Sequence, residues 1–212
     1  MDTTELLGLF RAEMRDQEQP YLFADETVYA YINAAQVEFC RLTEGIEDGR
    51  SIKLNVVPGV EWYPLNKRIL KLRKAYLTST GRPVDIVNQE RSEQGGIRFD
   101  GRPGPLKALV AGIEKGMLRA WPLPNEAAEV ALDVFRLPKP VGEGDSFEID
   151  EQHHMALLYW VKRLAYDVHD AETFDRRKSE DYEAKFRGYC AQARVEQTRA
   201  RRQVGSTQYG GL

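Results

Sequence analysis

The sequence is poor in cysteine, has no long apolar run and carries no strong excess of charge of either sign. Its 212 residues include two cysteines, Cys40 and Cys190, too few for the disulfide framework of a small secreted domain. No apolar stretch approaches the ~20 residues of a membrane-spanning helix. The formal net charge of −3 excludes a general attraction to nucleic acid or to an anionic membrane. Residues 1–5 lack the features of a signal peptide, so we expect a protein made in the cytoplasm.

The signatures of common catalytic sites are also missing. There is no Gly-x-Ser-x-Gly elbow, no Walker loop and no dinucleotide fingerprint. Cys40 has no base near it in the sequence and falls within an expected helix, so packing as a small apolar residue is favoured over nucleophilic chemistry. We predict no catalytic residue, no metal ligand and no cofactor.

One cluster of potential metal ligands needs its own explanation. It comprises Asp167, His169, Asp170, Glu172 and Asp175, with His153 and His154 one expected helix earlier. A metal site needs imidazoles and carboxylates that converge on one point, and it would make the protein a metal-dependent hydrolase. The spacing matches no common metal motif, so acidic residues that stabilise the positive end of the next helix are the favoured explanation.

The first 48 residues show helical periodicity. A helix is expected over residues 3–16, and Pro20 separates it from the next one. Asp25 is the expected N-cap of the second helix. Its apolar stripe comprises Val28, Ile32, Ala35, Phe39, Leu42 and Ile46.

After Gly45 and Gly49 the apolar period changes from 3.6 to 2, which indicates strands. The expected strands are residues 52–56, 69–77, 84–87, 97–99, 106–111, 117–121 and 130–137, and the expected loop is 90–96. Because no helix is expected between the strands, the pattern favours antiparallel pairing. A nucleotide-binding parallel sheet is disfavoured.

The last third is again helical. Asp150 is the expected N-cap of a third helix, and a fourth is expected from residue 171 to about 202. A short break at His169 and Asp170 makes these two helices antiparallel neighbours. The expected inward residues of the fourth helix are Phe174, Tyr182, Phe186, Tyr189 and Ala193.

These segments predict an α+β protein in which two helical pairs form a four-helix body around an inserted antiparallel β-module. The expected division is a helical pair at 1–48, a β-module at 49–141 and a helical hairpin at 142–202. The last segment, 203–212, has too little apolar content to fold alone, so we expect a flexible tail that a partner orders.

Two basic runs stand out against the acidic total. The first comprises Lys67, Arg68, Lys71, Arg73 and Lys74. Strand alternation places Lys71 and Arg73 on one face, opposite Leu70, Leu72 and Tyr76, which favours a solvated face over a nucleic-acid contact. The second comprises Arg194, Arg199, Arg201 and Arg202. These cations either complement the helix dipole or dock on another protein, with Tyr209 and Leu212 as anchors. The sequence leaves both explanations open.

Several residue patterns resemble the head-to-tail adaptor proteins of tailed bacteriophages, from about residue 4 to residue 190. In the first third they are Leu6-Leu7-x-x-Phe10-Arg11, Asp16, Pro20-Tyr21-Leu22-Phe23, Asp25-Glu26, Tyr31-Ile32-Asn33-x-Ala35-Gln36 and Glu38-Phe39. Later ones are Trp121-Pro122-x-Pro124, Arg136-Leu137-Pro138, His154-x-x-Leu157-x-x-Trp160, Ala165-Tyr166 and Asp170-Ala171-Glu172-Thr173.

The resemblance implies a structural protein of the virion neck. Members form a ring, commonly dodecameric, that lies beneath the portal protein, extends the DNA channel and carries the tail. The implied partners are the portal, a downstream tail or nozzle protein, other copies of the chain and passing genomic DNA without sequence specificity, with no membrane. The implied portal-binding candidates are Arg194, Arg199, Arg201, Arg202, Tyr209 and Leu212. Lys67, Lys71 and Arg73 would line the channel or face the tail. The alternative is a neck or stopper protein that contacts DNA through its basic runs.

Overall fold

A computed structural model describes residues 1–95, 97–169 and 174–203 of the chain. The chain separates into two compact units: residues 1–45 together with the chain from residue 137 onward, and residues 46–136. The first unit is helical and the second contains a mixed β-sheet, so the structure confirms the α+β class with a sheet inserted between N- and C-terminal helices. Among the described helices, none is long and apolar enough to cross a membrane.

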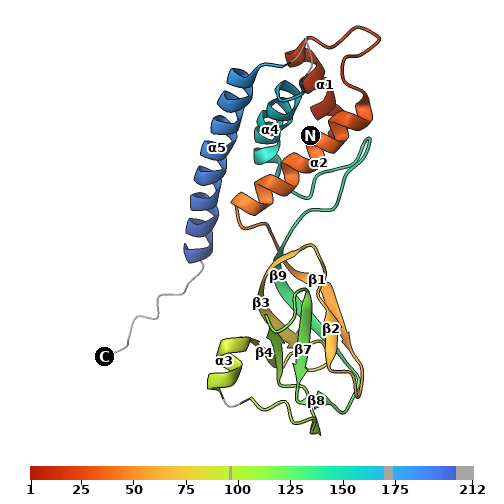
Figure 1. Ribbon diagram of the computed structural model, residues 1–212, viewed down its shortest axis with the longest axis vertical. Coiled ribbons are helices and arrows are strands. Elements are labelled where there is room, and N and C mark those ends of the chain that lie inside the picture. Colours follow the sequence, from red (N-terminus) through yellow and green to blue (C-terminus); the bar gives the residue numbers. More distant parts are fainter. Residues whose placement is uncertain (96, 170–173, 204–212) are drawn as a thin grey trace, which may run out of the picture. The chain divides into compact units, whose positions relative to one another are not determined.

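The helical unit is built around α4 (His154–Tyr166), which contacts all three other helices of the unit. These are α1 (Thr3–Met14), α2 (Asp25–Leu42) and α5 (Arg176–Gln203), and Figure 1 shows them grouped around α4. On α4, Leu157, Val161 and Ala165 are spaced four residues apart and fully buried. This spacing places them on one helix face, so α4 forms the centre of the helical core.

The boundaries of the first two helices differ in detail from the prediction. α1 begins with a capping box in which Asp2 accepts from the Glu5 amide, and Glu5 accepts from the Asp2 amide. Ala24, not Asp25, occupies the N-cap position of α2. Asp25 is instead the first helical residue, and its carboxylate binds Arg11.

The end of α2 also differs from the expected stripe. Glu44 and Gly45 take positive φ angles of 74° and 88°, a conformation that a helix cannot continue through. Ile46 is therefore the first residue of a strand and not the last apolar residue of the helix.

The second helical pair is confirmed as an antiparallel pair of neighbours. The start of α4 meets the middle of α5 through His153 and Tyr189, and its end meets the start of α5 through Arg163 and Ser179. Asp150 occupies the N-cap position of a short 3-10 helix, Glu151–His153, that precedes α4, and its side chain accepts no cap hydrogen bond. Phe174 is 43% exposed, so its predicted inward position is wrong. Residues 170–173 lie outside the described part.

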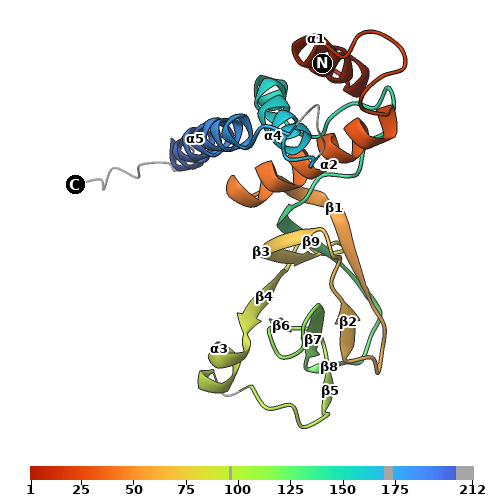
Figure 2. The same ribbon diagram turned by 45° about the horizontal axis from the view of Figure 1, so that its top comes forward.

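The β-unit contains a seven-stranded sheet with the order β1-β9-β3-β4-β6-β7-β2. Figure 2 shows how its strands curve around one core. Within it, Leu109, Leu118 and Val130 are fully buried. The seven strands are β1 (Ile46–Val56), β2 (Trp62–Pro64), β3 (Ile69–Leu77), β4 (Pro83–Asn88), β6 (Ala108–Ala111), β7 (Met117–Trp121) and β9 (Ala128–Arg136). A separate small pair joins β5 (Pro103–Gly104) to β8 (Leu123–Pro124).

The sheet is mixed, so the prediction of a purely antiparallel module is wrong. β4 and β6 pair in parallel, as do β5 and β8. Parallel neighbours need a long crossover that usually contains a helix, and the link from β4 to β6 contains α3 (Gln89–Gln94). This segment was expected to be a loop. Asn88 caps α3 by accepting from the Arg91 amide at 2.9 Å, and Ser92 is buried.

The expected strand at residues 97–99 is not formed. The segment instead contacts β7 through one side chain and one backbone group. The Phe99 ring lies 3.7 Å from the Arg119 guanidinium carbon, and the Trp121 side chain donates to the Arg98 backbone carbonyl at 3.0 Å. The second strand of the sequence, β2, was not predicted, because three residues are too few to show alternation.

Irregular pairing changes which residues of β3 share a face. Its register against β9 shifts between Ile69 and Lys71 and again between Leu72 and Lys74, and such bulges reverse the alternation of side chains. Leu72 therefore packs against the core, whereas Leu70 is 39% exposed. The expected common face of Leu70, Leu72 and Tyr76 is wrong for this reason.

Candidate functional site: the basic end of the last helix

The basic end of α5 is held by an apolar face further up the helix. Phe186, Cys190 and Ala193 are spaced four and three residues apart and are buried, as expected for one face of a helix. The Trp160 ring of α4 lies 5.0 Å from the Phe186 ring. This packing fixes the direction in which the last turns of α5 present their arginines.

Two of the four predicted arginines bind one carboxylate within the chain. Arg194 donates to Oε1 of Glu44 at 3.2 Å, and Arg201 donates to Oε2 of the same residue at 2.9 Å. The two arginines are seven residues apart, or about two helical turns, so they lie on one face. Glu44 follows α2 directly, and the three residues therefore tie the end of α5 to the end of α2.

The Glu44 carboxylate stays ionised in this arrangement. Burial acts to raise its pKa, but hydrogen bonds from Arg201 and Arg194 and their positive charge outweigh burial, and the pKa is lowered. A carboxyl group with a lowered folded-state pKa stabilises the fold above its unfolded-state pKa. That contribution is lost as the pH falls through the folded-state pKa.

Replacing Glu44 by glutamine is expected to lower the free energy of unfolding at neutral pH by about 0.5–1 kcal/mol, because both ion pairs are partly exposed. The difference from the wild type should shrink as the pH falls below 4.5, the ordinary value for this group, and disappear below the lower folded-state pKa, where the carboxyl group is protonated in both states. Chemical denaturation at the two pH values measures this. Glu18→Gln, an exposed change in the same unit, is the control, and a difference that persists in acid would contradict the assignment.

The other portal-binding candidates have different surroundings. Arg199 is exposed, and no ion pair or hydrogen bond of its side chain is present in the described part of the chain. The backbone of Arg202 is part of α5, but the structure does not describe its side chain. Tyr209 and Leu212 lie outside the described residues. Of the described candidates, Arg199 is thus exposed without a partner in the described part of the chain, whereas Arg194 and Arg201 bind Glu44.

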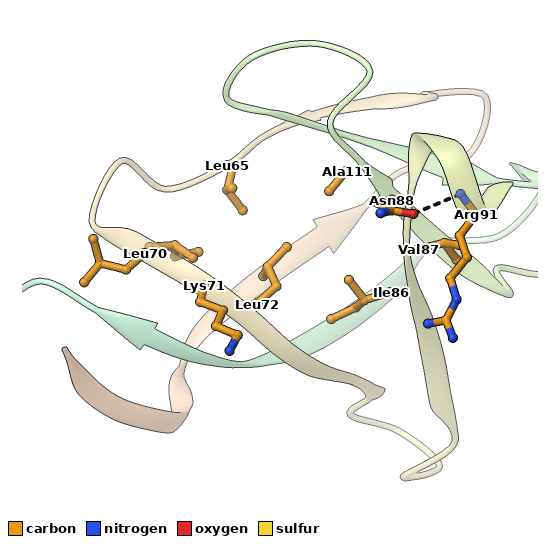
Figure 3. A pocket seen from close by; sticks show the side chains of 10 residues that line it. Leu65, Leu70, Lys71, Leu72, Ile86, Val87, Asn88, Arg91 and Ala111 are labelled. Atoms are coloured by element: carbon orange, nitrogen blue, oxygen red, sulfur yellow. Dashed lines mark hydrogen bonds between the residues drawn. The ribbon is translucent and has the colours of Figure 1, made fainter. Parts of the chain in front are cut away.

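The structure separates the three basic candidates of the β-unit. Arg73 binds the Glu47 carboxylate, lies 3.6 Å from Oδ1 of Asp133 and stacks on the Phe135 ring at 5.0 Å. The Glu47 hydrogen bond raises the Arg73 pKa. Lys67 is exposed in the link between β2 and β3, and Lys71 lies at the edge of a cleft shown in Figure 3. Arg73 is therefore engaged within the chain, whereas Lys67 and Lys71 face solvent.

Those potential metal ligands that the structure describes do not converge. Asp175 accepts from the Lys178 amide at 3.0 Å and so caps α5, Asp167 lies 3.4 Å from an Arg163 nitrogen, and the His169 ring stacks on Phe174. Over residues 1–95, 97–169 and 174–203, no group of three histidine, cysteine or acidic residues could hold a metal ion. Asp170 and Glu172 lie outside that part.

The two earlier histidines are structural. His153 and His154 are both buried. Nδ1 of His153 lies 3.0 Å from the Tyr189 hydroxyl, and Nε2 of His154 lies 2.8 Å from the Ile149 carbonyl. Burial lowers the pKa of His153, so its neutral form fits the packed helix pair.

Both cysteines are buried on helices and are reduced. Burial raises the pKa of Cys190 to about 12, and the thiolate is the nucleophilic form of cysteine. Cys190 is therefore unreactive at neutral pH, and Cys40 occupies a packed position on α2, as expected.

Sequence reasoning missed a buried polar network in the first helical pair. Arg11 donates to Oδ2 of Asp16 at 2.8 Å and to the Phe23 carbonyl at 3.1 Å, and it also binds Asp25. The Arg11 guanidinium stacks on the Tyr21 ring at 3.6 Å. The available signal was a charged residue beside Phe10 on the buried face of α1.

A second polar contact fastens the link after the β-unit. The Asn33 side chain donates to the Val141 carbonyl and accepts from the Val141 amide, both at 2.8 Å. Asn33 thus binds the backbone as a neighbouring strand would. Arg11, Asp16, Phe23, Asp25 and Asn33 thus form structural contacts within the helical unit.

The family model described as SU10 adaptor protein matches residues 1–208, nearly the whole chain. No curated protein matches the sequence.

Proposed function

Because the chain belongs to the SU10 adaptor protein family, a family of phage head-to-tail adaptors, we propose that it forms a ring beneath the portal protein. In this ring, which we take to be dodecameric, the chain extends the DNA channel and carries the tail or nozzle protein. The match over residues 1–208 is the observation that carries the proposal. Family membership also indicates a structural and not an enzymatic protein.

We assign the portal contact to the end of α5 and the residues after it. The clamp of Arg194 and Arg201 on Glu44 fixes this end, while Arg199 is exposed immediately before the last segment. A fixed, positively charged helix end loses little conformational freedom on binding, and this favours docking on an acidic or carbonyl-rich groove. Arg202, Tyr209 and Leu212 complete the proposed contact.

The test is assembly with the portal protein of the same phage, observed by electron microscopy and by sedimentation. Arg199→Glu, and separately removal of residues 203–212, should weaken association by about tenfold or more, because a reversed charge at a desolvated contact costs several kcal/mol. Arg177→Glu at the other end of α5 is the matched control, since Arg177 is also exposed. Unchanged assembly by both altered proteins would contradict the assignment.

A DNA-contacting neck or stopper protein is the second candidate. It is favoured by the exposure of Lys67 and Lys71, for which no ion pair is present in the described residues. DNA binding through such lysines weakens steeply with salt, because each phosphate contact releases counterions. A steep salt dependence of DNA affinity that Lys67→Gln and Lys71→Gln reduce would select this function, and a ring that binds the portal but not DNA would select the first.

A further inference from the structure

The hairpin of β3 and β4 is paired only beside its turn. Ala75 faces Val84 and Tyr76 faces Pro83. Away from the turn, β3 pairs with β9 on its far side, and β4 pairs in parallel with β6 on its far side. The facing edges of residues 69–74 and 85–88 therefore have no strand between them in the described part of the chain.

A cleft of about 670 Å³ lies where the two strands part. Its floor consists of half-buried aliphatic side chains that pack against the sheet core: Leu65, Ile69, Leu72, Ile86 and Ala111. Figure 3 shows Leu72 of β3 and Ile86 of β4 facing the same space, with Leu65 and Ala111 beside it. The volume falls within the range of about 300–1,000 Å³ typical of binding sites.

The rim of this cleft is positively charged. Lys71 comes from β3 and Arg91 from α3, both are exposed, and none of the residues that line the cleft is acidic. No carboxylate binds either side chain within residues 1–95, 97–169 and 174–203. The exposed Leu70 lies beside Lys71, so the rim offers an apolar and a cationic contact side by side.

We propose that this cleft binds an extended, acidic peptide segment of another polypeptide, which adds to the sheet between β3 and β4. Backbone groups of the segment would pair with the open strand edge. Because successive side chains of a strand point to opposite faces, alternate apolar residues would enter the aliphatic floor while carboxylates between them meet Lys71 and Arg91. This binding activity goes beyond the ring and portal contacts proposed above and does not depend on them.

The lining favours a peptide over single-stranded nucleic acid. Nucleic-acid grooves combine positive charge with aromatic side chains on which bases stack, and the cleft has an aliphatic floor with no aromatic residue among those that line it. The two register shifts of β3 and its edge lysine restrict pairing to a short segment, since bulges and charged residues protect strand edges from indiscriminate association.

The experiment uses the full chain and a short fluorescein-labelled peptide. In this peptide every second residue is valine, and the residues between the valines are glutamate and threonine. Fluorescence anisotropy should show saturable binding, and hydrogen exchange should show added protection at residues 69–74 or 85–88. Leu70→Ser, and separately Lys71→Gln combined with Arg91→Gln, should each weaken binding by about tenfold. Lys74→Gln is the control, because Lys74 is exposed on the same strand but does not line the cleft.

Three results would overturn the proposal. They are absence of saturable binding up to about 1 mM peptide, equal binding of a matched peptide with lysine in place of glutamate, and binding that the substitutions at Leu70, Lys71 and Arg91 leave unchanged. An oligothymidine that binds in a Lys71- and Arg91-dependent manner when the acidic peptide does not would assign the cleft to nucleic acid. Since the assay contains no portal protein, its outcome is independent of the portal assembly test.

Discussion

Replacing Arg136 by leucine is expected to lower the free energy of unfolding of the chain by about 3–5 kcal/mol, the usual cost of removing one partner of a buried ion pair. Arg136 is 8% exposed, and its Nε lies 2.5 Å from Oδ2 of the buried Asp48 side chain. It follows Val130, Leu132 and Val134 at alternate positions of β9. Leucine would suit this apolar row, but the Asp48 carboxylate would lose its guanidinium.

The same two strands supply the control. Lys53 of β1 and Glu129 of β9 form an ion pair at 2.9 Å, but both side chains are well exposed. Lys53→Ala should change the free energy of unfolding by at most about 1 kcal/mol. Chemical denaturation followed by fluorescence of Trp62 and Trp121, both in the β-unit, measures both changes. Adding Asp48→Leu to Arg136→Leu should recover much of the lost stability, and a double variant no more stable than Arg136→Leu would contradict the ion-pair explanation.

Replacing Arg11 by methionine is expected to destabilise the helical unit by a similar amount, about 3–5 kcal/mol. Methionine replaces the unbranched aliphatic stem of arginine but not its guanidinium group, so the packing of the stem changes little while the polar contacts are lost. Asp16, which is 6% exposed, would keep its bonds from the Leu22 and Phe23 amides but lose its buried positive partner. The expected structural result is loss of order in residues 15–24, because Arg11 also holds the Phe23 carbonyl and Asp25.

Hydrogen exchange of residues 15–24 and denaturation followed by circular dichroism test this expectation. Arg15→Met is the control, since Arg15 is exposed at the end of the same helix and should change stability by about 0.5 kcal/mol or less. If Arg11→Met and Arg15→Met had equal effects, the network would have no role in stability.

The sequence predicted the positions of several elements closely. The expected strands at residues 69–77 and 117–121 have the bounds of β3 and β7. Four residues of the expected stripe of α2 lie in the core: Val28, Ile32, Ala35 and Phe39. The class and the place of the inserted sheet followed from the change of period after Gly45.

The errors share a physical origin in contacts distant along the chain. α3 carries no apolar stripe, and its stability comes from the Asn88 cap and the burial of Ser92. Missing this helix concealed the crossover, and with it the parallel pairing of β4 and β6. The register shifts of β3 similarly arise from its pairing with β9, which no local pattern encodes.

The candidate site was predictable only in part. The basic composition of the end of α5 was visible in the sequence, but the use of Arg194 and Arg201 by Glu44 depends on a contact across about 150 residues. The cleft between β3 and β4 was not predictable, because it results from two strands that separate. Composition thus indicated where basic side chains lie along the chain. Only the fold distinguishes those bound to carboxylates of the same chain from those that another molecule can bind.

The first residue of β1 faces the last residue of β9: Ile46 and Arg136 are direct partners in the sheet. Partners in an antiparallel pair have Cα atoms only about 4.5–5.5 Å apart, so the chain leaves and re-enters the helical unit at nearly one point. In the distance that it spans between Gly45 and Leu137, the insertion of about ninety residues is thus equivalent to a tight turn in the helical unit. Evolution or an engineer could exchange the whole insertion for another module, or for a two-residue bridge, while leaving the helical scaffold intact.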